Sequence, residues 1–98
     1  MIAVLNPAST NIAQLVAAEL RRRGNKSVKS LFWNSDKGNF SVFITSPTPE
    51  NPESFNFFPG PDESVEQIAD RISELCDRIM NGEKMEKEYA DTSGSGTI

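Results

Sequence analysis

The sequence contains no histidine and only one cysteine. Histidine is the side chain best suited to proton transfer near neutral pH and a frequent zinc ligand, so its absence removes most hydrolase designs. A single cysteine cannot close an internal disulfide, so stability has to come from packing. We therefore expect a protein of a reducing compartment, by default the cytoplasm.

Long apolar runs are also missing. No stretch approaches the roughly 18 consecutive apolar residues that span a bilayer. The apolar start, Met1 to Leu5, is short and lacks the basic leader of a signal peptide. We expect neither secretion nor membrane insertion.

The sequence shows no motif that carries chemistry. The one glycine-rich stretch, residues 94–96, lies in a polar tail without a preceding strand or a following helix, unlike a nucleotide-binding loop. Cys76 falls on an apolar helical stripe with no histidine to activate it, which favours a place in the core over a role as nucleophile. We expect no catalytic residues, no cofactor and no metal site.

The chain has 98 residues, which suits one domain with a modest core. We expect residues 1–89 to form a single compact domain and residues 90–98, which have nothing to bury, to be a disordered tail. The net charge of −4 is unevenly spread. Residues 1–49 carry six basic and two acidic side chains, whereas residues 50–98 carry four basic and twelve acidic ones. Such asymmetry can guide association with a charged partner.

Apolar residues recur at helical spacing after a segment of capping residues and a proline, and they predict a helix from about residue 8 to 23. Three arginines at 21–23 favour the negative end of its dipole, and Gly24 can adopt the left-handed conformation that ends it. Residues 1–5 carry no decisive period. A short strand and a helical extension both stay open there.

The residue types then change to strand formers at 27–34 and 39–46. Turn-forming residues between them, ending in Gly38, predict a β-hairpin with a bulged turn. The proline-rich segment 47–52 cannot form a regular ladder and predicts an exposed extended connection. An apolar run at 55–58 predicts a third strand, which gives a sheet of three strands.

The strongest period covers residues 65–80, where apolar residues step by three and four along one helical face. Ser64 followed by Gln67 matches a capping box, and Gly82 can end this second helix. The pattern could continue weakly to Tyr89.

The order α-β-β-(β)-α predicts a two-layer α+β fold, in which a short antiparallel sheet is covered on one face by two helices. The order resembles that of double-stranded RNA-binding domains, whose second helix begins with a lysine-rich phosphate-contacting motif. Here the corresponding residues, 62–66, hold three carboxylates, so RNA binding does not carry over. The alternative is that residues 2–5 begin a β-α-β unit, as in flavodoxin-like folds. A doubly wound sheet of that kind needs more strand-helix pairs than the remaining residues provide.

The first candidate binding surface is acidic. Carboxylates follow the second helix at steps of three and four, opposite its apolar face, and a four-residue step of about 6 Å is near the spacing of successive phosphates. The alternative is a solvated face on which Arg71 and Arg78 pair locally with Glu74. The acidic stripe comprises Glu63, Glu66, Asp70, Glu74 and Asp77.

The second candidate is a basic cluster that could contact phosphates or an acidic protein. Its alternative is ordinary charge complementarity at a helix end. The basic cluster comprises Arg21, Arg22, Arg23, Lys26 and Lys29.

The third candidate is an apolar sheet face, because three strands cannot hide all the aromatic residues on one side. Alternation places Leu31 and Trp33 opposite Phe32, so we expect an exposed patch with Trp33 as its anchor. The alternative is a second small core beneath the proline-rich segment. The patch comprises Leu31, Trp33 and Phe43.

These features predict a non-enzymatic protein-binding domain, a small acidic inhibitor or adaptor that docks on a larger complex. A virus-encoded inhibitor of a host defence complex is one example. We expect another protein or a protein-nucleic-acid complex as partner, and no membrane. The alternatives are a nucleic-acid-binding protein that uses Arg21 to Arg23, which we expect less, and a self-assembling subunit that forms a homodimer.

Overall fold

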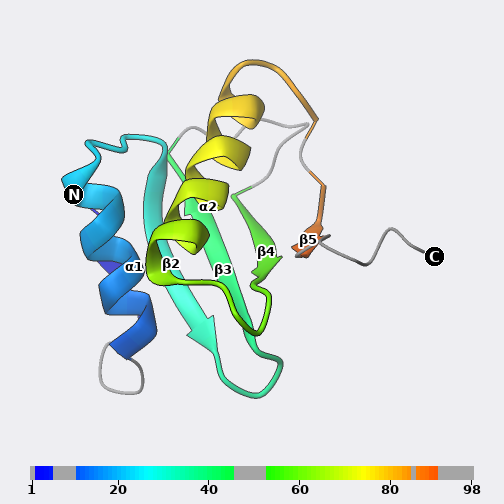
Figure 1. Cartoon of the computed structure of the whole chain (residues 1–98). Helices are drawn as coiled ribbons and strands as arrows, with labels where there is room; N and C mark the ends of the chain where they lie inside the picture. Colours follow the sequence, from blue (N-terminus) through cyan, green and yellow to red (C-terminus); the bar gives the residue numbers. More distant parts are fainter. Residues whose placement is uncertain (1, 6–10, 46–52, 85, 91–98) are drawn as a thin grey trace.

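The computed structural model describes residues 2–5, 11–45, 53–84 and 86–90. Its two helices lie on one side of a mixed sheet, which confirms the α+β fold (Figure 1). The elements follow in the order β1 (Ala3–Val4), α1 (Asn11–Arg22), β2 (Val28–Asn34), β3 (Asn39–Ile44), β4 (Ser54–Phe58), α2 (Val65–Met80) and β5 (Glu88–Ala90).

The sheet has the spatial order β1-β2-β3-β4-β5. The three central strands form an antiparallel meander, while β1 pairs in parallel with β2 and β4 in parallel with β5. Each parallel pair needs a crossover, which α1 and α2 provide. Both crossovers join strands of the same direction and move the same way across the sheet. The strong preference for right-handed crossovers therefore places both helices on one face.

The prediction of three strands is wrong, because two short edge strands complete the sheet. Residues 3–4 form β1, which decides the open question about residues 1–5 in favour of a strand. The β-α-β unit that begins there is present, within a mixed sheet. The weak continuation of the second helix to Tyr89 is also wrong, since residues 88–90 form β5 and pair with residues 56–58 of β4.

The central elements agree with the sequence. The helix over 65–80 is confirmed, as is its capping box: the Ser64 hydroxyl accepts from the Gln67 N–H at 3.1 Å, and the Gln67 side chain accepts from the Ser64 N–H at 2.8 Å. Gly24 ends α1 with φ of 73°, and Gly38 closes the hairpin turn with φ of 70°. The expected start of the first helix near residue 8, the connection 47–52 and residues 91–98 of the expected tail lie outside the described residues.

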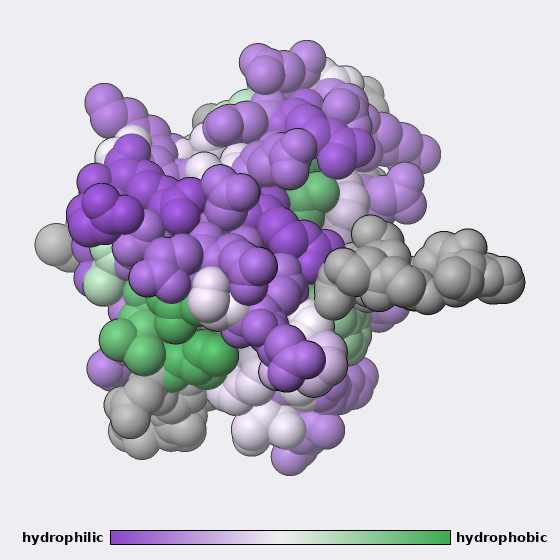
Figure 2. Space-filling model, in the orientation of Figure 1, coloured by the Kyte–Doolittle hydropathy of each residue, from purple (hydrophilic) through white to green (hydrophobic). Residues whose placement is uncertain are grey.

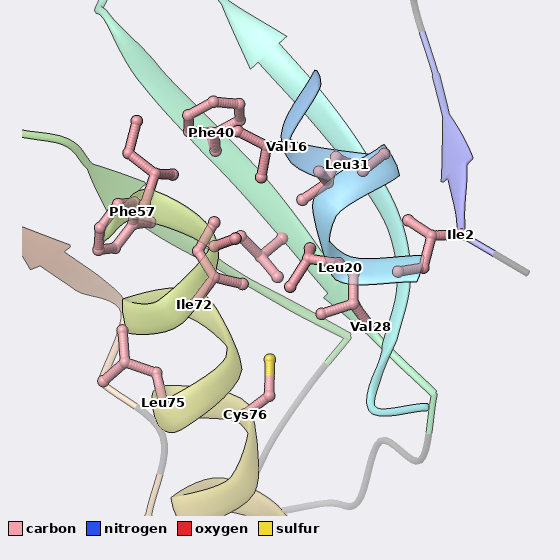
Figure 3. Close-up of a cluster of buried hydrophobic side chains, with 14 of the residues drawn as sticks. Ile2, Val16, Leu20, Val28, Leu31, Phe40, Phe57, Ile72, Leu75 and Cys76 are labelled. Carbon is pink, nitrogen blue, oxygen red and sulfur yellow. The ribbon is translucent and has the colours of Figure 1, made fainter. Parts of the chain in front are cut away.

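The core fills the space between the sheet and the two helices. Leu20 of α1, Leu31 of β2 and Ile72 of α2 are all fully buried there (Figure 3). The α2 stripe that the sequence shows is the face that the helix turns to the sheet, with the same three- and four-residue steps. Cys76 is fully buried in this stripe, which confirms its predicted place in the core.

Asn25 holds the two layers together at the end of α1. Its side-chain oxygen accepts from the backbone N–H groups of Ser27 and Val28, each at 2.9 Å, and its side-chain nitrogen donates to the Ser73 hydroxyl of α2 at 3.0 Å. One amide therefore fixes the turn from α1 into β2 and the position of α2 beside it.

Candidate binding surfaces

The arginines of the basic cluster are engaged within the protein. Arg22 and Arg23 both bond the carboxylate of Glu19, at 2.6 and 2.8 Å, and Arg21 donates to the backbone carbonyl of Ile2 at 2.8 Å. The hydrogen bonds from Arg22 and Arg23 lower the pKa of Glu19 from its ordinary 4.5 to about 2. The arginines close the end of α1 and dock it on the start of β1, so they resemble a structural cluster more than a free cationic patch.

Arg23 also reaches the neighbouring helix. It donates to the Asp70 carboxylate at 3.0 Å and to the Glu66 backbone carbonyl at 3.1 Å. The basic cluster and the acidic stripe thus meet between α1 and α2. The two lysines of the cluster, Lys26 and Lys29, are exposed but lie beyond the helix, in the loop and in β2.

The acidic stripe is only partly free. The Glu63 side chain, 11% exposed, bonds Arg71 at 2.8 Å and accepts from the Gly60 N–H at 2.7 Å. Arg71 forms an ion pair with Glu63, and Arg78 forms one with Glu83, rather than with Glu74 as expected. The hydrogen bond to Glu83 raises the pKa of Arg78, and the Glu74 carboxylate still contributes to this rise. Three exposed carboxylates form no ion pair with any described residue: Glu66, Glu74 and Asp77.

The expected exposed patch around Trp33 is placed on the wrong side of the sheet. Leu31 pairs with Val42 and Trp33 with Phe40, all on the side that faces the helices. Leu31 is fully buried, and the Trp33 ring lies 4.7 Å from that of Phe40, centroid to centroid. A bulge between residues 28 and 30 shifts the alternation of β2, which the sequence does not reveal. Phe43 alone of the predicted patch faces away from the helices.

The side of β2, β3 and β4 that faces away from the helices carries a different set of residues, which we call the open face. Its middle has no charged side chain. The Ser41 hydroxyl donates to the Asn56 side-chain oxygen at 3.1 Å, and the Asn39 amide donates to the same oxygen at 3.3 Å. Three phenylalanines, all half-buried, lie among these polar groups. The open face comprises Ser30, Phe32, Asn39, Ser41, Phe43, Ser54, Asn56 and Phe58.

A hollow of about 370 Å³ lies at one end of the open face. Ser30 is one of the residues that line it; the residue is only 6% exposed and shares this side of the sheet with Phe43. The Ser30 hydroxyl forms no hydrogen bond with any residue that the structure describes. We call this feature the Ser30 hollow; the described residues that line it are Leu5, Lys29, Ser30, Phe43, Ile44, Thr45 and Glu53.

The Cys76 thiol is poorly placed to act as a nucleophile. Burial, with a smaller contribution from Asp77, raises the pKa of the Cys76 thiol from 9.0 to about 12, so the thiolate is scarce at neutral pH. Across the described ranges, no three histidine, cysteine or carboxylate side chains come together as metal ligands. Neither described helix is both long and apolar enough to cross a membrane.

No protein-family model, curated protein or solved structure matches this chain.

Proposed function

We propose that the chain is a non-enzymatic protein-binding domain, a small inhibitor or adaptor that docks on a partner through its open face. The observation that carries the proposal is the lack of charge in the middle of that face, where Phe32, Phe43 and Phe58 stand half-buried among serine and asparagine. Interface cores are depleted in charged residues and enriched in aromatic ones. The serine and asparagine side chains are uncharged and can hydrogen-bond a partner, which offsets the cost of burying their polar groups.

The opposite side of the molecule suits a different task. Figure 2 shows that the helical side is largely hydrophilic, apart from a few apolar areas, of which the largest lies over the lower part of α1. The exposed Glu66, Glu74 and Asp77 give this side a negative potential that would steer the approach of a basic partner rather than hold it. A domain with one charged side and one uncharged side fits a one-sided contact with a larger assembly, such as a host defence complex blocked by a virus-encoded inhibitor.

Affinity capture from lysate of the native source tests the proposal. Phe32→Thr and Phe58→Thr remove open-face rings with a residue that favours strands, so both variants should fold, as circular dichroism would verify. The matched control is Leu15→Thr, because Leu15 is 54% exposed on α1, on the other side of the molecule. We expect a partner that is retained by wild type and Leu15→Thr and is lost by both phenylalanine variants.

Two other outcomes would contradict the docking of a separate partner on the open face. Loss of the partner only when Glu66, Glu74 and Asp77 are all changed to glutamine would assign the contact to the acidic stripe. Recovery of the chain alone, as a stable dimer by light scattering, would indicate self-assembly.

A further inference from the structure

We propose that the Ser30 hollow is the anchor point of this interface and receives the phenol ring of a tyrosine side chain from the partner protein. The inference rests on the proposed docking function. It adds the identity of the group that fills one end of the open face.

The size and walls of the hollow suit a single aromatic ring. A cavity of about 150 Å³ is enough to bind benzene, so the 370 Å³ of the hollow hold one substituted ring and leave space for it to enter. Leu5 and Phe43 supply apolar wall surface. Leu5 is 52% exposed, so it leaves apolar area for a partner to cover.

Ser30 requires a polar atom on that ring. A buried hydroxyl without a partner costs free energy relative to one that is hydrogen-bonded, and the Ser30 hydroxyl has no partner among the described residues. A phenol hydroxyl can both donate to and accept from a serine hydroxyl. A phenylalanine ring would fill the same space and leave Ser30 unpaired.

The charges beside the hollow indicate a neutral occupant. Lys29 and Glu53 both line it and carry opposite charges, so their contributions largely cancel and favour neither an anion nor a cation. Tyrosine is neutral at physiological pH and is a frequent anchor residue at interfaces. Among neutral side chains, the phenol combines the ring and the hydroxyl that the hollow accommodates.

The test uses the full chain with soluble probes, so it needs no partner. p-Cresol and toluene, the side-chain analogues of tyrosine and phenylalanine, are titrated while the backbone amide and methyl resonances are followed by NMR. We expect p-cresol to shift resonances of Leu5, Ser30 and Phe43 and to bind more tightly than toluene. Ser30→Ala should weaken the affinity for p-cresol by about twofold to tenfold, because one neutral hydrogen bond is lost, and should leave the affinity for toluene unchanged. The control is Ser35→Ala, in the turn at the other end of the sheet, which should change neither the affinity for p-cresol nor that for toluene.

Equal binding of the two probes, shifts outside the hollow, or an unchanged p-cresol affinity in Ser30→Ala would each overturn the assignment. N-acetyl-tyrosinamide tests whether the occupant is a tyrosine side chain or a small free phenol. If it binds at least as tightly as p-cresol, a tyrosine of a partner protein is supported. If it does not bind in the hollow, the assignment to a partner's tyrosine is overturned. The two proposals fail separately. If the probes do not bind the hollow but Phe32→Thr and Phe58→Thr still lose the captured partner, only the anchor is wrong.

Discussion

The guanidinium of Arg23 lies 3.0 Å from the carboxylate of Asp70, and this ion pair joins the end of α1 to α2. The two residues are 47 positions apart in the sequence. One belongs to the basic cluster and the other to the acidic stripe, which the sequence presents as rival surfaces for different partners. In the fold each patch neutralises part of the other, and the uncharged open face remains as the distinct surface.

The contact between Arg23 and Asp70 should be measurable as a coupling between variants. Arg23→Gln and Asp70→Asn should each lower the Tm. In the double variant the decrease in Tm should be smaller than the sum of the two single decreases, because either change alone already breaks the ion pair. The effect should be small and fall at high salt, since Asp70 is 75% exposed. Arg22→Gln combined with Asp70→Asn is the control, as the Arg22 ion pair lies within α1. Additive losses for both pairs would contradict a link between the helices.

Glu19 should make the stability depend on pH in the acid range. Its pKa is lowered from 4.5 to about 2 by the hydrogen bonds from Arg22 and Arg23, so the folded state holds this carboxylate ionised where the unfolded state protonates it. The stabilisation is therefore complete above pH 4.5 and is lost as the pH falls from 4.5 towards 2. Thermal denaturation should show Glu19→Gln below wild type at neutral pH, with the gap closing across that window. A gap that is constant with pH would mean that the lowered pKa has no part in stability.

Cys76 should react only when the domain opens. The thiol is fully buried and its pKa is raised to about 12, so both access and thiolate formation are suppressed. Ellman's reagent should label it slowly in buffer and at once in denaturant, at a rate that follows unfolding. Cys76→Ser should destabilise the domain by about 1–3 kcal/mol, because it buries a hydroxyl in an apolar environment, whereas Cys76→Ala should cost less than that polar penalty. Fast labelling of the native protein would contradict the buried position.

The strongest local patterns in the sequence predict the central elements well. The apolar period of α2, its capping box and the turn at Gly38 each depend on residues close together in the chain, and each is present. The edge strands could not be predicted in this way. With two residues in β1 and three in β5, neither strand is long enough to show an alternating pattern in the sequence. Each forms because its backbone hydrogen-bonds to the neighbouring strand.

The binding surfaces were harder to predict than the elements. The alternation of Leu31, Phe32 and Trp33 does not tell which side of β2 faces the helices. That depends on the bulge between residues 28 and 30, and Trp33, expected on the exposed side, lies on the other. The partner of Arg23 depends on how two helices pack, which no local pattern encodes. The Ser30 hollow gathers residues from the ends of three strands and from the segment before β4, and only the register of the sheet brings them together.

Tyr89 provides the clearest test of the fifth strand. Its ring meets that of Phe55 edge to face at 5.2 Å, and its hydroxyl accepts from the Glu86 N–H at 2.7 Å. Tyr89→Ala should reduce the free energy of unfolding by about 1–3 kcal/mol, below the usual cost for a fully buried ring because Tyr89 is only partly buried. Tyr89→Phe, which keeps the ring and loses one hydrogen bond, should cost about 0.5–1.5 kcal/mol. Urea denaturation measures both, with Lys87→Ala as an exposed control in the same segment. If Tyr89→Ala were as stable as Lys87→Ala, β5 would not be held on the sheet by this contact.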